Sequence, residues 1–285
     1  MIKLSIIIVA YKSDSVIFEC IKSIIEYNDL KKEEIEIIIV DNYIHSIIQD
    51  KILLLNTNGI KIKYIKNKKN GGFGQGNNIG VAESNGEIFL FLNPDTLLID
   101  NIFTEIVSII EGNNNYIVGF TLRDNYGKLN NSYSIFPEKF HLMFVFFLIK
   151  KYLFYSPNQI AYLNKLIWPW GAALAIHKGP FLKAGMFDEN IFLCNEEPDL
   201  LRRIPNRKIY ISQKSIVHTE GHGNGGTLYR HQEYLKSLKY YFEKYKLHFR
   251  LYYIFIKCST YLKIILKINY KDNKNLLKAM NYKIS

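Results

Sequence analysis

Short apolar runs alternate with segments of helical periodicity over the N-terminal third of this chain, and this alternation restricts the possible folds more than any other feature. Leu4 to Ala10 and Ile35 to Val40 are apolar runs rich in β-branched residues, as expected for buried parallel strands. Between them, apolar residues recur at helical spacing from Ile17 to Ile25. Ile60 to Lys66 and Ile88 to Leu92 predict two further strands. This order predicts an α/β fold, with a parallel sheet and helices on both faces.

A glycine-rich segment, NGGFGQGNNIG from Asn70 to Gly80, precedes the fourth predicted strand. Glycine lets backbone N–H groups approach a ligand closely, and a helix N-terminus favours an anion. We therefore expect a turn followed by a helix from Asn77 to about Ser84, with a diphosphate nearby; a simple flexible loop is the alternative. The dinucleotide fingerprint is not matched, because its third glycine would fall at Ile79.

Two carboxylates follow predicted strands, at the edge of the sheet where α/β proteins bind their ligands. Asp41, with Asn42 after it, ends the second strand and suits a contact to a base or a ribose. Asp95, in the motif Asn93-Pro94-Asp95, ends the fourth strand. It suits a divalent cation, since Mg²⁺ is commonly held by one or two carboxylates together with substrate phosphates. A single aspartate in this position is otherwise a turn or capping residue.

A second group of candidate site residues surrounds Gly171. The small residues Gly171 to Ala173 allow another group to approach the backbone closely. Trp168 and Trp170 flank them. Aromatic faces of this kind bind sugars, but they also fill protein cores, so both interpretations stay open.

An acidic cluster follows, with Glu196, Glu197 and Asp199 inside four positions. At the start of a helix these charges would simply favour the helix dipole. Crowded carboxyl groups also raise one another's pKa, which suits a general base. Arg203 lies one helical turn after Asp199, so it can assist a leaving diphosphate or pair with Asp199.

Bulk properties narrow the class of partner. The chain has 285 residues, 48% of them hydrophobic, which fits one large α/β domain with or without a tail. Its formal net charge of +11 favours an anionic partner: a nucleotide, a membrane lipid or a nucleic acid. The three cysteines show no metal-binding spacing, and the N-terminal MIKLSIIIVAY does not resemble a signal peptide. We therefore expect a cytoplasmic protein.

Taken in chain order, these motifs resemble those of the family 2 glycosyltransferases, and among them the rhamnosyltransferase-like enzymes of bacterial surface polysaccharide synthesis. The resemblance covers Lys3 to His222. Its marks are SIIIVAY, Val40 to Asn42, NGGFGQGNNIG, Leu92 to Thr96, Gly171, Gly185 to Glu189, and Glu196 to Leu200 with Arg203.

The resemblance implies a GT-A fold, a Rossmann-like mixed and mostly parallel sheet with flanking helices. It implies inverting transfer of a sugar, rhamnose among the candidates, from a dTDP- or UDP-linked donor. The acceptor would be a saccharide on a polyprenyl lipid, in O-antigen (lipopolysaccharide) or capsule-type synthesis.

The resemblance also assigns residues. It places the catalytic base at Glu197, beside Glu196 and Asp199, and it implies Mg²⁺ or Mn²⁺ held by Asp95 and His218. Asn93 stands where many members have aspartate, which leaves Asp95 as the charged ligand of that motif. The implied donor-binding residues are Ala10, Tyr11, Asp41, Asn42, Gly72, Phe73, Gly74, Asn77, Asn78, Asn93, Trp170, Gly171 and Arg203.

Two other classes of protein fit part of the sequence. A nucleotidyltransferase would use the same kind of sheet, but it would need a glycine-rich signature after the first strand, and Tyr11-Lys12-Ser13 has no glycine. A non-enzymatic module that binds membrane or nucleic acid would account for the charge, but it leaves the acidic cluster unexplained. We therefore expect no nucleic-acid partner.

The C-terminal residues 227–285 are expected to form a basic helical tail after a catalytic domain of residues 1–226. Leu228 to Tyr245 and Leu247 to Ile268 are predicted helices. At about 100° per residue, the second helix separates two arcs. One arc holds Lys246, Arg250, Lys257, Lys263, Lys267 and Lys271, and the opposite arc holds Leu251, Ile254, Phe255, Cys258, Tyr261, Leu262, Ile265 and Leu266.

Two interpretations of this second tail helix stay open. It packs on the catalytic domain with a solvated basic edge, or it lies on anionic lipid at the inner face of the cell membrane. Its lysines argue against a helix that spans the bilayer. The apolar run from Leu142 to Ile149 is likewise too short to span one, and we expect a core or interface helix there.

Overall fold

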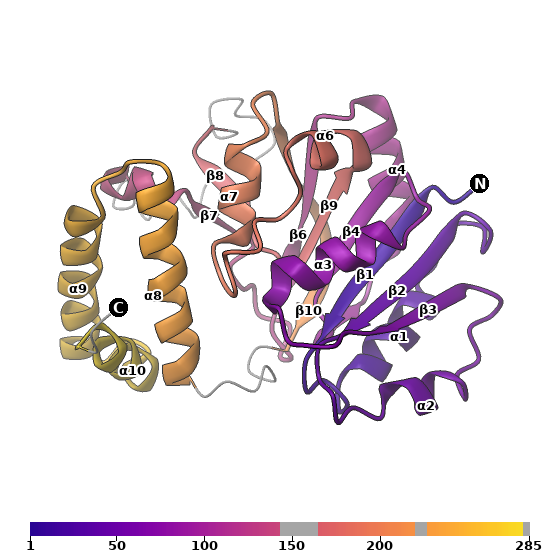
Figure 1. Ribbon diagram of the computed structural model, residues 1–285, viewed down its shortest axis with the longest axis horizontal. Helices are drawn as coiled ribbons and strands as arrows, with labels where there is room; N and C mark the ends of the chain where they lie inside the picture. The colour runs from indigo at the N-terminus through magenta and orange to yellow at the C-terminus, as the bar shows by residue number, and fades with distance from the viewer. Residues whose placement is uncertain (143–164, 220–226, 282–285) are drawn as a thin grey trace.

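The computed structural model describes residues 1–142, 165–219 and 227–281. An eight-stranded mixed sheet, in the order β3-β2-β1-β4-β9-β6-β10-β5, forms its centre (Figure 1). The strands are β1 (Leu4–Ala10), β2 (Ile35–Asp41), β3 (Lys61–Lys66), β4 (Ile88–Leu92), β5 (Thr96–Leu98), β6 (Tyr116–Arg123), β9 (Ala173–His177) and β10 (Lys208–His218).

The first four strands, β1 to β4, are parallel to one another, as predicted. β9 runs antiparallel to both β4 and β6, and β10 runs parallel to β6, which makes the sheet mixed. Two short strands, β7 (Tyr133–Ile135) and β8 (Ile167–Pro169), pair separately in a small second sheet. The predicted boundaries of β1 and β4 are those observed, and β2 and β3 differ by one residue at one end.

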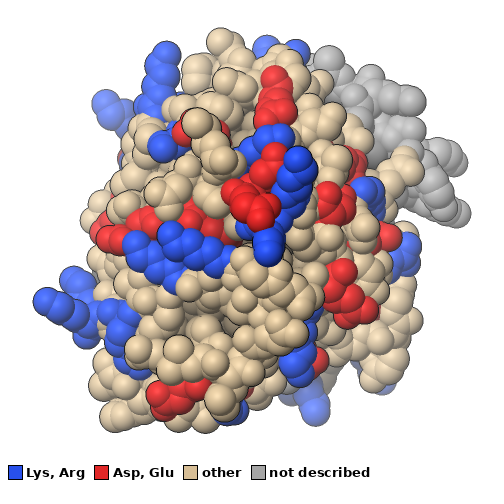
Figure 2. Space-filling view, turned by 90° about the vertical axis from the view of Figure 1, so that its right-hand side faces the viewer, with Lys and Arg blue, Asp and Glu red and all other residues tan. Residues whose placement is uncertain are grey.

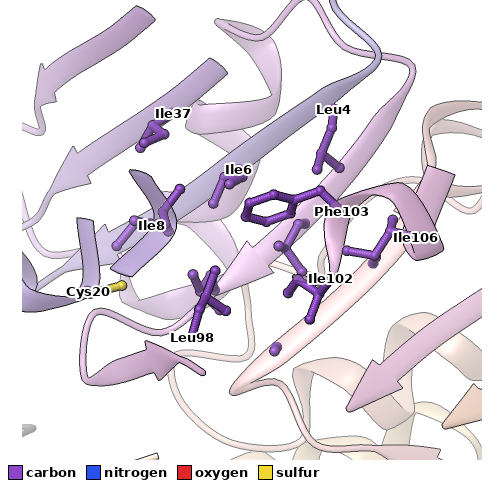
Figure 3. Close-up of a cluster of buried hydrophobic side chains, with 14 of the residues drawn as sticks. Leu4, Ile6, Ile8, Cys20, Ile37, Leu98, Ile102, Phe103 and Ile106 are labelled. Atoms are coloured by element: carbon purple, nitrogen blue, oxygen red, sulfur yellow. The ribbon is translucent and has the colours of Figure 1, made fainter. Parts of the chain in front are cut away.

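Helices cover both faces of the sheet because successive side chains of each strand point to opposite sides. On one face, Ile6 and Ile8 of β1 pack with α1 (Ile17–Glu26) and α4 (Phe103–Gly112) (Figure 3). On the other face, Ile7 packs in a cluster that includes residues from three further helices. These are α3 (Gly72–Ala82), α6 (Lys178–Lys183) and α7 (Glu196–Arg202). Each isoleucine buried in this way stabilises the fold by about 1.5–3 kcal/mol.

The glycine-rich segment is helix rather than turn, which corrects the sequence expectation. α3 begins at Gly72, and a Cβ on Gly76 or Gly80 would lie 2.6 Å from Val9 Cγ1 or 2.4 Å from Ile7 Cγ2. Glycine therefore brings the helix backbone directly onto β1. Low helix propensity favoured a turn here, but close packing against the sheet overrides it.

The tail forms three helices: α8 (Thr227–Lys244), α9 (Phe249–Ile265) and α10 (Tyr270–Asn281). The first two confirm the predicted helices, whereas α10 was not predicted. α8 lies between the sheet and α9 in Figure 1. The domain boundary at residue 226 stays a prediction. Within the described residues, no helix combines the length and apolarity needed to cross a bilayer.

α9 packs with the side that was expected to be its basic edge. Tyr252 and Thr260 are buried, and Ile256 joins two apolar clusters with α8 and α10. Of the opposite, apolar arc, Phe255 is partly buried and packs on Phe140 at 5.2 Å, whereas the other members are exposed. Most of this arc is therefore not buried against the described part of the catalytic domain. Residues 143–149 of the predicted helix at Leu142 to Ile149 lie outside the described residues, as does His222.

Candidate active site

Two groups of predicted site residues meet at one edge of the sheet. β4 and β9 pair antiparallel, with Leu92 opposite Ala173, and the Asn93 amide donates to the Ala172 carbonyl at 2.9 Å. The residues that follow β4 therefore lie beside those that precede β9, which include Gly171. The ends of β1 and β2 lie at the same edge, because β1 runs parallel to β4 and Ala10 is opposite Asp41 at the end of β2.

Asp95 and His218 form the first element of the site. Asp95 Oδ1 lies 3.3 Å from His218 Nε2, and both side chains are largely buried. Two further contacts fix the pair: the Thr219 amide donates to the Asp95 carbonyl at 3.0 Å, and Thr96 stands opposite His218 in the sheet. Asn93 Nδ2 is 3.5 Å from His218 Nε2. A carboxylate and an imidazole from distant strands are thus adjacent, as predicted.

The fit of a divalent cation can be tested on these side chains. Within the described residues, no three His, Cys, Asp or Glu side chains come together as a metal site. Asp95 and His218 supply two potential ligands, and the buried His218 Nδ1 has no hydrogen-bond partner in the part of the chain that the structure describes. Two protein ligands are compatible with Mg²⁺ or Mn²⁺ only where substrate phosphates complete the coordination.

Glu197 forms the second element, at the start of α7. A Cβ on Gly171 would lie 1.8 Å from Glu197 Oε1, so only glycine leaves room for this carboxyl group. Loss of solvation raises the pKa of Glu197 to about 7, and the N–H of Gly171, by bonding the carboxylate, opposes that rise. Glu197 remains partly exposed. It can therefore accept a proton from a group outside the protein near neutral pH.

Glu196 is the buried neighbour of Glu197. Its side chain is only 2% exposed, and Oε1 has no hydrogen-bond partner within the described residues. Burial, followed by the charge of Glu197, raises the pKa of Glu196 well above its ordinary value. This environment favours the protonated form of Glu196, since two adjacent charges away from water are costly.

Asp199 is fully buried and bonded to three side chains. Arg203 Nη2 donates to Oδ2 at 2.8 Å, Lys244 Nζ to Oδ1 at 2.6 Å, and Tyr245 OH to Oδ1 at 2.9 Å. Such a carboxylate fixes the position of α7, and it presents no exposed oxygen to a substrate. Arg203 is bonded as well to the carbonyls of Ala184 and Met186.

Lys244, the last residue of α8, also binds Asp188 Oδ2 at 2.7 Å. Although burial opposes it, hydrogen bonds from Lys244, Asn190 and Tyr240 hold the pKa of Asp188 well below its usual range. Asn78 of α3 exchanges two hydrogen bonds with the neighbouring Phe187 backbone. Lys244 therefore joins the loop that rests on α3 to the helix that carries Glu197. No sequence pattern indicated this contact, because Lys244 and Asp199 are 45 residues apart.

The residues predicted to contact the nucleotide have partners inside the protein. Asp41 is fully buried and accepts from Tyr64 OH at 2.8 Å and from the Tyr43 amide at 2.9 Å. Asn42 Nδ2 donates to the Gly72 carbonyl at 3.1 Å. The Tyr64 bond links β2 to β3, and the Asn42 bond links the end of β2 to α3. Whether either side chain also contacts a donor stays a prediction.

The start of α3 is similarly occupied. The Gly72 amide donates to Asn70 Oδ1 at 3.1 Å, and the Phe73 amide donates to the Phe192 carbonyl at 3.1 Å. Asn77 is buried and its Nδ2 donates to the Phe73 carbonyl. A Cβ on Gly74 would lie 3.1 Å from Phe187 Cβ. Packing is the observed role of this segment, and a donor contact there stays a prediction.

The two tryptophans differ. Trp168 Nε1 donates to the Ile135 carbonyl at 3.3 Å, which is a structural contact. Trp170 Nε1 is buried without a hydrogen-bond partner in the described residues, next to Gly171. Its backbone amide donates to Ser132.

Two side chains beside the predicted residue Tyr11, those of Lys12 and Tyr43, were missed by the sequence analysis. Tyr11 and Tyr43 follow β1 and β2, and their rings meet edge to face at 5.8 Å. Lys12 Nζ lies 5.6 Å from the centre of each ring. Their positions directly after two strand ends were the available signal. A cation over two aromatic rings is suited to a ligand with an anionic and a planar part.

Three solved structures have a similar fold. The mannosyltransferase PcManGT of Pyrobaculum calidifontis, solved with GDP-Man and Mn²⁺, matches 98% of this chain and 72% of its own at 13% identity and a TM-score of 0.61. GalNAc-T7, solved with UDP, GalNAc and Mn²⁺, matches 86% of this chain at 15% identity and a TM-score of 0.60. S. aureus TarS matches 83% at 15% identity and a TM-score of 0.54.

At these identities the likeness establishes the fold alone. This chain spans 40% of the TarS chain and 50% of the GalNAc-T7 chain. No curated protein sequence matches it. The sequence comparison with families is decisive: residues 5–171 match the family described as glycosyl transferase family 2. Because that match covers more than half of the 285 residues, and the sheet is the mixed one expected of a GT-A fold, the chain belongs to glycosyl transferase family 2.

Proposed function

We propose that the protein is an inverting glycosyltransferase that moves a sugar from a nucleotide-diphosphate donor to a hydroxyl group of a saccharide acceptor, with Glu197 as the general base. The observation that carries this proposal is the position of Glu197. Its carboxyl group is partly exposed, rests against Gly171, and has a pKa of about 7. Gly171 lies beside the end of β4, which Asp95 follows, and Asp95 contacts His218 at the end of β10.

The reaction requires one proton transfer by the protein. As the acceptor oxygen attacks the anomeric carbon, Glu197 takes the hydroxyl proton, and the bond from that carbon to the diphosphate oxygen breaks. A base whose pKa lies near the working pH is efficient, because it is substantially ionised and still basic. Attack from the side opposite the diphosphate inverts the anomeric centre.

Asp95 and His218 would hold Mg²⁺ or Mn²⁺ together with the donor diphosphate. When bound there, the cation would neutralise the charge that develops on the leaving group. The structures of GalNAc-T7 and PcManGT, which contain Mn²⁺, support this assignment. Asn93 lies beside His218 and would orient it.

Asp199, Arg203 and Lys244 are positioning residues in this proposal. They do not reach the substrate; they fix α7 so that Glu197 meets Gly171. Tyr11, Lys12 and Tyr43 would contact the nucleotide, beside Asp41 and Asn42 at the ends of β1 and β2. The nucleotides named for the neighbouring structures, UDP and GDP-Man, support a nucleotide-sugar donor, and we favour a dTDP- or UDP-linked one.

We further propose a rhamnose donor and a polyprenyl-linked saccharide acceptor, in O-antigen or capsule-type polysaccharide synthesis. The support is the motif resemblance and the basic tail with its exposed apolar helix face. The enzyme would then work from the cytoplasm at the inner surface of the membrane. Such an acceptor would present its sugar at the lipid surface.

A panel of UDP-, dTDP- and GDP-linked sugars tests the core of this proposal. The purified protein should release nucleoside diphosphate from one donor class, and the same donor should raise the melting temperature. Glu197→Gln should keep the thermal shift and lose the release. If no sugar nucleotide is hydrolysed, transferred or bound, the proposed function is wrong.

A further inference from the structure

The exposed face of α9 has no partner among the described residues, although it is apolar along the whole helix. Leu251, Ile254, Tyr261, Leu262 and Ile265 are between 47% and 74% exposed. They recur at intervals of three or four residues, with Cys258 in the same row, so they form one stripe. Over 17 residues the stripe is about 25 Å long. We name these six residues the α9 stripe.

Packing on the opposite side holds the α9 stripe outward. Tyr252 is buried beside Tyr241 and Phe242 of α8, and Phe140 meets its ring at 5.4 Å. Tyr253 OH donates to the Met280 carbonyl of α10 at 2.5 Å. These contacts fix the rotation of α9. The stripe could not turn inward without breaking the cluster of buried aromatic side chains.

Positive charge surrounds the α9 stripe. Residues 246–285 contain nine Lys or Arg and one Asp, so eight of the eleven net positive charges lie in this tail. Arg250 and Lys263 are exposed on α9 itself, and Lys267 and Lys271 are exposed just beyond it. The far end of the molecule, around β3 and α2 (Ile48–Ile52), differs: Figure 2 shows Lys and Arg mixed there with Asp and Glu.

We propose that the α9 stripe is a membrane-docking surface that inserts into the interface of an anionic bilayer, with the tail lysines against the lipid headgroups. An apolar row flanked by basic residues matches such an interface, because the apolar side chains enter the acyl region and the basic ones contact the anionic headgroups. A second copy of this chain fits less well, because pairing two such tails would bring like charges together. A nucleic acid would leave the apolar row uncovered. This inference rests on the proposed function in one respect: an acceptor carried on lipid would explain why the enzyme docks on a membrane.

Cys258 offers a direct probe of this surface. It is the exposed one of the three cysteines, since Cys20 is buried and Cys194 partly so, and it lies within the stripe. The full-length protein labelled there with an environment-sensitive dye is mixed with vesicles of equal phosphatidylglycerol and phosphatidylcholine. We expect a blue-shifted emission and protection from acrylamide quenching. With pure phosphatidylcholine, both effects should be much smaller.

The matched control places the same dye at the other end of the molecule. The variant Leu54→Cys with Cys258→Ser puts it at an exposed position beyond α2, on the side away from α9 in Figure 1. Its emission should not change on the same vesicles. Protein that binds vesicles while the Cys258 dye stays quenchable would show that another surface docks, and would overturn the proposal.

Substitutions separate the two components of binding. Ile254→Glu with Ile265→Glu should lower vesicle partitioning at least ~10-fold, whereas the matched pair Leu53→Glu with Leu54→Glu, also at exposed aliphatic positions, should not. Each of Lys263→Gln, Lys267→Gln and Lys271→Gln should lower it about fivefold, which corresponds to ~1 kcal/mol per charge. Lys31→Gln, Lys32→Gln and Lys61→Gln are exposed controls.

The failure of this proposal can be distinguished from failure of the proposed function. Vesicle binding is measured without a donor, and hydrolysis of a nucleotide sugar in vesicle-free buffer should be unchanged in Ile254→Glu with Ile265→Glu. Self-association in vesicle-free buffer that this double variant abolishes would identify the stripe as a contact between copies. Equal binding of intact and variant protein to anionic vesicles would also overturn the proposal.

Discussion

The sheet edge around Glu197 and the outer surface of α9 use apolar and charged residues in opposite ways. At the sheet edge, the carboxyl groups of α7 are buried or partly buried, and Asp199 is held by Arg203 and Lys244. On α9, apolar groups are exposed and the lysines around them are solvated. The first arrangement fixes a geometry for chemistry. The second leaves apolar surface exposed to water, which is unfavourable and which insertion into lipid would relieve.

The two regions meet at the end of α8. Lys244 and Tyr245 belong to the tail by sequence, but both bond Asp199, two residues from the proposed base. Arg202 of α7 stacks on the Tyr245 ring at 4.2 Å and pairs with Glu138. The C-terminal end of α8 therefore helps to hold the candidate active site in place. The contrast between the regions begins beyond it, at α9.

The largest expected effect comes from the base itself. Glu197→Gln should lower turnover ~100-fold to ~10,000-fold, since general base catalysis typically contributes that much. Donor affinity should stay unchanged, because in the proposed mechanism this carboxyl group contacts the acceptor. Turnover and donor binding are measured separately, with Glu243→Gln, an exposed glutamate of α8, as the matched control. Near-normal turnover of Glu197→Gln would remove Glu197 from the mechanism.

The pH dependence follows from the same carboxyl group. Its pKa is raised to about 7, so it is protonated and inactive as a base below that pH. Turnover should therefore rise with pH and level off above neutrality, rather than level off near pH 5 as for an ordinary glutamate. A profile flat from pH 5 to 8 would contradict the buried environment described for Glu197.

Metal removal is the next largest effect. A chelator should stop transfer, and Asp95→Ala should weaken donor binding at least ~10-fold, as loss of support at a metal site commonly does. Added Mn²⁺ should restore the chelated wild type and not the variant. Full activity in chelator would mean that Lys12 and other cationic side chains, rather than a metal, neutralise the diphosphate charge. Asp124→Ala, in an exposed turn after β6, is the control.

Substitution of Lys244 tests whether the end of α8 supports the candidate active site. Lys244→Met removes a positive charge 2.6 Å from Asp199, so the negative charge near Glu197 is less compensated. The rising limb of the pH profile should move to higher pH by less than about 1 unit, with severalfold lower turnover at pH 7. Lys244→Arg should largely restore both.

A structural role alone would lower turnover without moving the pH limb. Lys236→Met is the matched control, because Lys236 lies on the same helix but pairs with Glu233. A shifted limb in Lys236→Met, or none in Lys244→Met, would confine the tail's role to packing.

Much of the sheet edge could be predicted from the sequence because its residues follow recognisable strands. β1, β2 and β4 are continuous apolar runs, and Asp95 stands where such a run ends. Gly171 and Glu197 were identified as separate features, and their contact arises because the start of α7 lies against the residues before β9. The occupied hydrogen bonds of Asp41 and Asn42 could not be predicted, since they depend on how β3 and α3 pack beside β2.

The tail was less predictable for two physical reasons. α9 carries apolar residues around most of its circumference, so the sequence did not decide which arc packs; Tyr252 and Ile256 lie among the basic residues. Contacts such as that between Lys244 and Asp199 join charged groups that local periodicity does not relate. α10 is rich in lysine and asparagine and was missed, because its few apolar residues, Ala279 and Met280 among them, bury only against α8 and α9.

The smallest expected effect tests the close packing that distinguishes the sheet from the tail. Gly80→Ala places a methyl group 2.4 Å from Ile7 Cγ2, in the buried layer between α3 and β1. Such overpacking costs about 1–3 kcal/mol and outweighs the gain of about 0.5–1 kcal/mol that alanine brings to a helix. Gly112→Ala is the matched control at the end of α4, where a Cβ meets nothing within 4 Å. Thermal unfolding should show Gly80→Ala below the wild type and Gly112→Ala at or above it. Since Gly80 touches β1 and not the sheet edge, the affinity for the donor should be unchanged. A Gly80→Ala protein that kept normal stability but no longer bound the donor would instead indicate that the glycine-rich segment binds the ligand.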